Sequence, residues 1–176
     1  FMFLPYVSFV EDSFPIPMIV SFIGLAGYWA FIFLRKAEKI SKWVQFAALT
    51  FIGMMATHAF TIGVGAQRQM MVRPHYPFYD DFAMWLFLWN GEVNWIATIL
   101  LVVSIPLLAI SKKRGWWLAV IGATTILVLD AFTFIFRHST LDFLYGSLLA
   151  IGVLFFTVVP YFKNHLLGVT SELREE

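Results

Sequence analysis

The chain has 176 residues, of which 60% are hydrophobic, 19% aromatic and only 13% charged. Soluble domains carry about a quarter of their residues as charged side chains, so this composition excludes a soluble globule. The net charge of +1 is spread over short segments and offers no basic face to nucleic acid. Because the chain has no cysteine, an iron–sulfur cluster, Cys-ligated zinc and thiol catalysis are also excluded. We therefore expect an integral membrane protein that lies in a lipid bilayer.

Recurring apolar segments predict an all-α fold, a polytopic bundle of transmembrane helices that forms one domain over residues 1–176. A helix needs about 20 mostly apolar residues to cross about 30 Å of hydrocarbon. Five segments satisfy this length, at about residues 16–34, 43–65, 93–110, 116–136 and 141–162. The apolar residues 1–10 and a first residue other than Met lead us to expect a sixth span before them.

The third apolar region, residues 82–110, is too long for one straight span. It contains the polar run Asn90-Gly91-Glu92-Val93-Asn94. We expect an interfacial segment at 83–89, a break in this polar run, and a membrane span only after it.

Lysine and arginine are concentrated in residues 35–42, in residues 112–114 and after residue 162. The positive-inside rule places these basic segments, and the C-terminus with them, in the cytoplasm. Residues 66–92 and the junction at 137–142 then lie on the extracytoplasmic side. That side also receives three arginines, which an anionic ligand would explain: Arg68, Arg73 and Arg137.

Two ionisable residues fall inside predicted spans, at matching distances from the extracytoplasmic ends. His58 and Asp130 both lie roughly 10 Å deep at about 1.5 Å per residue, and Glu92 reaches a similar level if its helix is continuous from Phe82. An ionisable group in hydrocarbon costs at least about 2.5 to 3.5 kcal/mol and usually faces a partner inside the bundle. The three residues could form a metal, proton or quinone site. The alternative is a hydrogen bond between His58 and Asp130 that only ties two helices together.

The fourth and fifth spans meet at a polar junction that contains His138 and Asp142. At a separation of four residues, both side chains lie on one helical face and can hydrogen-bond. His138 can then act as a nucleophile or acid whose tautomer Asp142 fixes, while arginine forks bind phosphate oxygens. The plainer alternative is that Arg137 and His138 reach lipid headgroups and Asp142 caps the fifth helix.

The order Arg73-Pro74, a polar interruption, and His138-x-x-x-Asp142 followed by Phe143-Leu144-Tyr145-Gly146-Ser147 resembles the type 2 phosphatidic acid phosphatase superfamily. The resemblance covers residues 67 to about 159. It implies a hydrolase of lipid phosphate or polyprenyl diphosphate in which His138 attacks phosphorus, Asp142 orients it and Arg73 clamps the phosphate. The sequence departs from the family pattern where Ala66 replaces a lysine, Phe132 an arginine and Glu92 a histidine. Glu92 would then be the general acid.

A third hypothesis is a respiratory subunit that binds haem b or a metal ion. Bis-imidazole ligation requires two histidines on facing helices, and His58 and His138 lie on the same side. Since the phosphatase residues are incomplete, we favour a non-catalytic or accessory subunit of a larger membrane complex, with other membrane subunits as partners and a polar extracytoplasmic site.

Overall fold

The computed structural model describes residues 15–36, 39–72, 82–137 and 140–168, with side chains at 23–36, 39–66, 89–132, 134–135 and 144–168. This part of the chain is helical and contains no strand, which confirms the predicted all-α fold. The helices are α2 (Pro15–Leu34), α3 (Lys39–Val72), α4 (Phe82–Ala109), α5 (Lys113–Arg137), α6 (Thr140–Val158) and α7 (Pro160–Leu167).

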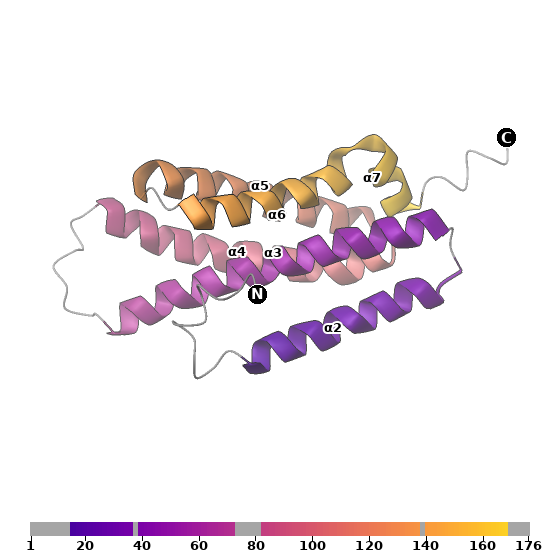
Figure 1. Cartoon of the computed structure of the whole chain (residues 1–176), viewed down its shortest axis with the longest axis horizontal. Helices are drawn as coiled ribbons and strands as arrows, with labels where there is room; N and C mark the ends of the chain where they lie inside the picture. Colours follow the sequence, from indigo (N-terminus) through magenta and orange to yellow (C-terminus); the bar gives the residue numbers. More distant parts are fainter. Residues whose placement is uncertain (1–14, 37–38, 73–81, 138–139, 169–176) are drawn as a thin grey trace.

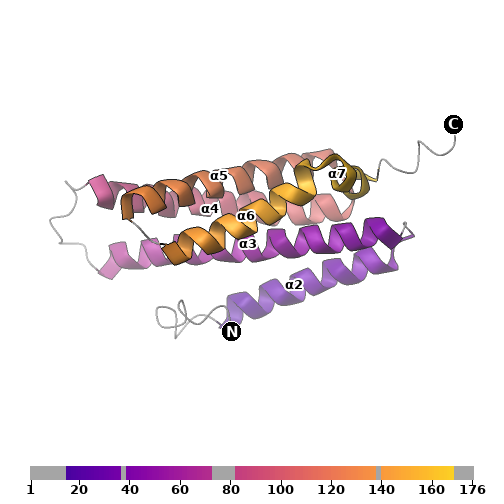
Figure 2. The same cartoon turned by 45° about the horizontal axis from the view of Figure 1, so that its top comes forward.

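Helices α3 to α6 form an up-and-down bundle (Figure 1). Each helix packs against the next one in the chain, and α6 packs back against α3. Helix α2 lies along the outside of this bundle against α3, as Figure 2 also shows. The turn between α4 and α5 is short, which makes the two helices antiparallel neighbours.

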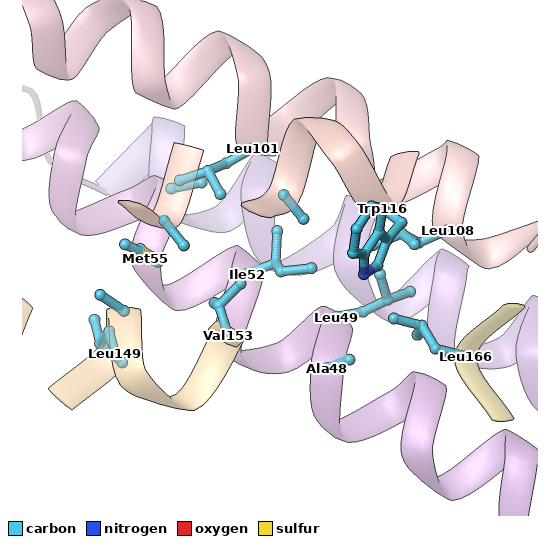
Figure 3. Close-up of a cluster of buried hydrophobic side chains, with 14 of the residues drawn as sticks. Ala48, Leu49, Ile52, Met55, Leu101, Leu108, Trp116, Leu149, Val153 and Leu166 are labelled. Atoms are coloured by element: carbon cyan, nitrogen blue, oxygen red, sulfur yellow. The ribbon is translucent and has the colours of Figure 1, made fainter. Parts of the chain in front are cut away.

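The centre of the bundle is filled by aliphatic side chains from α3, α4 and α6 (Figure 3). Ile52 of α3 lies near Val153 of α6 there, and Leu49 of α3 lies near Trp116 of α5. Leu49, Ile52, Met55, Leu101 and Val153 are all fully buried. The outer surface of α4, α5 and α6 is apolar too, with exposed residues Ile96, Ile99, Ile121, Val128, Leu148, Ile151 and Phe155. A helix that is apolar all round belongs in a membrane, since a soluble bundle keeps its outer face polar.

Three helical segments of the described residues are long and apolar enough to cross a membrane: Lys39–Ala66, Trp89–Ala109 and Lys113–Phe132. Helices α6 and α7 satisfy the same criterion only as a bent pair, which would make a fourth span. Ile23–Leu34 of α2 is a shorter apolar helix. These lengths are those of a multi-pass membrane protein.

The predicted break in the third apolar region is wrong, because α4 runs without interruption through Asn90, Gly91 and Asn94. The polar residues are accommodated inside the helix: the Asn94 side-chain Nδ2 donates to the Asn90 carbonyl oxygen at 2.7 Å. Gly91 packs closely against Ala66 of α3, where a larger side chain would collide. The glycine and the asparagines thus serve helix packing, and the helix does not end there.

The last predicted span, residues 141–162, also differs from the structure. Helix α6 ends at Val158, and α7 begins at Pro160 after a bend of 74°. Proline has no backbone N–H to continue the ladder of hydrogen bonds, so the helix breaks at this point. Helix α7 ends at Gly168, whose φ of 71° is the left-handed conformation of a helix C-cap.

Candidate intramembrane polar site

Two ionisable side chains from different helices meet at one backbone position of a third helix. His58 of α3 and Asp130 of α5 are 5% and 4% exposed. A Cβ atom added to Gly146 of α6 would lie 2.9 Å from His58 Nε2 and 2.8 Å from Asp130 Cγ, and closer still to Asp130 Oδ2. The structure therefore places His58 and Asp130 side by side, and Gly146 provides the space in which they meet.

The residues on either side of Gly146 add two hydroxyl groups. The Tyr145 ring packs edge-on against the His58 imidazole, with ring centres 5.1 Å apart and planes at 73°. Ser147 is buried. Neither Tyr145 Oη nor Ser147 Oγ has a hydrogen-bond partner among the described residues. Helix α6 therefore brings a small backbone position and the Tyr145 ring to the His58–Asp130 pair, and Ser147 is a further buried hydroxyl group on this helix.

Helix α4 contributes asparagine side chains to this part of the bundle. Asn94 is fully buried, and its Nδ2 donates to the Asn90 carbonyl oxygen and, at 2.5 Å, to Asn90 Oδ1. The Asn94 Oδ1 atom accepts no hydrogen bond from the described residues.

The packing between α4 and α5 shows where these asparagines lie along the long axis of the bundle. Gly122 of α5 faces Leu101 of α4, with the Ala97 carbonyl oxygen nearby. Asp130 lies two helical turns, about 12 Å, further along α5. The same distance along the antiparallel α4 leads back to the region of Asn90 and Asn94. All four bundle helices therefore carry polar side chains at about this level.

Glu92, the third ionisable residue predicted at this depth, is exposed on the surface of α4. It lies close to Asn94 in sequence but on a different helical face. The structure thus brings His58 and Asp130 together and leaves Glu92 outside the interior where they meet.

Of the residues that the phosphatase resemblance assigns, Glu92 is exposed on α4, and the others lie outside the described side chains. Arg73 and His138 are not among the described residues. The backbones of Arg68, Arg137 and Asp142 belong to α3, α5 and α6, but their side chains are outside the description. The His138–Asp142 pair, the arginine cluster and the haem pair His58–His138 therefore stay predictions.

Metal binding was the other hypothesis for His58 and Asp130. Among the described residues, no group of three or more His, Asp and Glu side chains is placed to hold a metal ion. The pair itself supplies two donors, whereas a zinc site uses three or four protein ligands. A His–Asp pair with neighbouring hydroxyl and amide groups is instead suited to holding a proton or water.

Four residues near this level of the bundle were not predicted to be parts of the site: Asn94, Tyr145, Gly146 and Ser147. The sequence nonetheless contains features that could have indicated two of them, Gly146 and Asn94. A small residue within an apolar span permits close helix approach, and an asparagine within a span needs partners inside the bundle. The missing information was which faces of the helices point inward.

Comparisons with models of known protein families, with curated proteins and with solved structures found no match.

Proposed function

We propose that this chain is a non-catalytic integral membrane subunit of a larger membrane complex, in which His58 and Asp130 form a site that accepts and releases a proton. The observation that carries the proposal is the meeting of these two side chains at Gly146. Ionisable residues buried in membrane spans are costly, and proton relays are among the functions that retain them.

The surroundings of the pair favour a proton site over a simple tie between helices. A tie needs one hydrogen bond between two side chains. Here Tyr145, whose ring packs against the imidazole, adds a hydroxyl group that no described residue satisfies. Ser147 Oγ on α6 and Asn94 Oδ1 on α4 are further buried polar atoms without a partner among the described residues. Such atoms can hold water molecules that pass a proton to or from the imidazole and the carboxyl group.

The limited extent of the polar site favours a role as a subunit. Between this site and the basic end of the bundle, the described interior consists mostly of fully buried aliphatic residues such as Ile52, Leu101, Ile126 and Val153. The buried hydroxyl groups of Ser104 and Thr157 donate to backbone carbonyl oxygens of their own helices. A proton that reaches Asp130 would therefore meet mainly aliphatic side chains on the way to the other side of the membrane. It has to be exchanged with the side from which it came or with a neighbouring subunit.

The proposal includes an orientation and a number of spans. We assign the basic segments and the C-terminus to the cytoplasm by the positive-inside rule, so that the His58–Asp130 pair lies in the extracytoplasmic half. Helix α2 and the bent pair α6–α7 would complete five spans, with a sixth before residue 16. The lipid phosphatase and haem hypotheses remain predictions that depend on His138.

The subunit part is tested by extracting the tagged protein from native membranes in a mild detergent and measuring the mass of the intact assembly by native mass spectrometry. We expect stoichiometric partner chains. A homogeneous monomer would contradict the assignment as a subunit.

The site is tested on the purified protein in lipid by infrared difference spectroscopy between two pH values. We expect a carboxyl band that is absent in Asp130→Asn and altered in His58→Gln, while Glu92→Gln leaves it unchanged. A difference spectrum that is the same in Asp130→Asn and the wild type would contradict the proposal that this pair binds a proton.

A further inference from the structure

The end of the bundle opposite the polar site is held together around Ser111, in the turn between α4 and α5. Arg35, just after α2, donates from Nη1 to the Ala109 carbonyl oxygen at 3.0 Å and from Nη2 to Ser111 Oγ at 3.3 Å. Gln45 of α3 donates from Nε2 to the same Ser111 Oγ at 2.9 Å and to the Leu166 carbonyl oxygen at 3.2 Å. Segments far apart in sequence are therefore fixed at one place.

Helix α7 is attached to the same end of the bundle. The Ser41 hydroxyl and His165 Nδ1 are hydrogen-bonded at 3.2 Å, and both residues are buried. Trp116 Nε1 donates to the Thr157 carbonyl oxygen at 2.6 Å. The 74° bend before α7 turns it away from the direction of α6, at the end where α2 and α3 are connected (Figure 1). We use the name platform for this end of the bundle, where Arg35, Gln45, Ser111 and His165 join the helices.

The platform carries a surplus of positive charge. We use the name basic collar for its five exposed cationic residues, Lys36, Lys39, Lys112, Lys113 and Arg114. The acidic residues within the described ranges, Glu92, Asp130 and Asp142, all lie toward the other end of the bundle. In the full sequence, segments 35–42, 112–114 and 163–176 together hold nine lysines and arginines and four glutamates, so the surplus at this end is positive.

The helix ends increase this surplus. Helices α3, α5 and α7 all begin at the platform, and none has an acidic residue in its first turn. Instead Lys39, Lys113 and Lys163 occupy these first turns. The N-terminus of a helix carries partial positive charge, so lysines there add to the charge that attracts an anion. Lys163 also lies over the Trp116 ring, with its Nζ 4.2 Å from the ring centre.

Exposed aromatic residues place the collar at the membrane surface. Trp43 and Trp117, each within four residues of a collar residue in sequence, are 52% and 51% exposed, and Tyr161 in the first turn of α7 is 56% exposed. Tryptophan and tyrosine are enriched at the level of the lipid headgroups in membrane proteins. An anion that reaches the collar at this level belongs to the headgroup layer of the bilayer.

From the charge surplus, the helix ends and the aromatic residues we infer that the basic collar binds the phosphate groups of anionic phospholipids. Clusters of lysine and arginine beside a membrane span attract anionic headgroups, and each residue contributes separately. The inference is independent of the proton site and of the partner subunits, because it depends only on the platform at the other end of the bundle.

The test uses the full chain reconstituted in nanodiscs of phosphatidylcholine, with or without a minority of phosphatidylglycerol. Bound lipid is counted by native mass spectrometry after exchange into detergent. We expect the wild type to retain phosphatidylglycerol in preference to phosphatidylcholine, and rising salt to reduce that preference.

The decisive variant is Lys112→Gln/Lys113→Gln/Arg114→Gln, which removes three charges from exposed positions. The preference should fall about fivefold for each charge removed, or roughly 100-fold in total. The matched control Lys112→Arg/Lys113→Arg/Arg114→Lys keeps the charge and should keep the preference.

Three outcomes would each overturn the inference. The wild type could retain the two lipids equally, its preference could be independent of salt, or the preference could survive in the neutral variant. If the triple variant is poorly folded, Lys113→Gln alone and the salt series on the wild type decide the question.

Discussion

Gly146 has the strictest size requirement of the residues around the polar site. The carboxyl group of Asp130 and the imidazole of His58 fill the space beside its Cα. A side chain larger than hydrogen at this position would collide with both groups. In a helix, glycine costs about 1 kcal/mol relative to alanine, so its presence here is explained by the close approach of the two side chains.

We expect Gly146→Ala to destabilise the protein. Overpacking costs about 1 to 3 kcal/mol, of which about 1 kcal/mol is regained through helix propensity. The matched control is Gly65→Ala in α3, where an added Cβ meets nothing within 4 Å. The free energy of unfolding of both variants, measured in lipid bilayers or mixed micelles, checks this. A Gly146→Ala protein as stable as Gly65→Ala would show that Asp130 does not occupy the space beside Gly146.

Part of this site could be predicted from the sequence at the level of residues. His58 and Asp130 stood out because charge is rare in apolar spans, and equal distances from the span ends predicted that they would meet. Glu92 satisfied the same criterion of depth but is exposed, because depth along a helix says nothing about direction around it. Asn94 and Gly146 needed the packing of the helices before their roles could be recognised.

At the level of helices, close approach of α3 and α4 explains why α4 is continuous. Gly91 and Ala66 allow the two backbones to come together, and Asn94 satisfies part of its hydrogen-bonding capacity within its own helix. Small residues at such contacts are typical of helix pairs in membranes, where packing drives association.

The contact between α3 and α4 predicts a compensating pair of substitutions. Gly91→Ala should lower the free energy of unfolding by about 1 to 3 kcal/mol, because its Cβ would collide with that of Ala66. Adding Ala66→Gly should recover part of the loss, since it removes the atom that collides. The stabilities of the two single variants and the double variant are compared in the same detergent. Losses that simply add would contradict direct contact.

The platform around Ser111 predicts an effect of Gln45 on helix α7. Gln45→Leu removes the donor to Ser111 Oγ and the Leu166 carbonyl oxygen, and should cost about 1 to 3 kcal/mol. The control is Thr50→Val, whose hydroxyl bonds only to the Phe46 carbonyl oxygen within the same helix. Limited proteolysis after α7 and thermal unfolding measure the difference. If the two variants behave alike, Gln45 does not hold α7 in place.

The helices themselves were largely predictable, since long apolar runs have to become helices in a bilayer. Their ends were less so. Helix α3 begins at Lys39, before the predicted span at 43, because lysines continue a helix beyond the hydrocarbon. The bend before α7 follows from Pro160, a signal that the apolar character of residues 141–162 concealed.

For the whole molecule, the two ends of the bundle differ in chemistry. One end holds the polar interior of His58 and Asp130, and the other carries the basic collar and the exposed aromatic residues. This asymmetry is what the proposed orientation in the membrane rests on.

The orientation can be measured with single cysteines, because the chain has no native cysteine to interfere. In intact cells, a membrane-impermeant maleimide should label Tyr79→Cys, in the predicted extracytoplasmic segment, and should label Lys113→Cys only after permeabilisation. The reverse pattern would invert the topology and put the polar site in the cytoplasmic half.

The central claim is that His58 and Asp130 interact inside the membrane, and a double-mutant cycle tests it most directly. The free energy of unfolding in lipid is measured for the wild type, His58→Gln, Asp130→Asn and the double variant. We predict a coupling free energy of roughly 0.5 to 2 kcal/mol, the range found for polar pairs between membrane helices. Effects of the two substitutions that add without coupling would contradict the account.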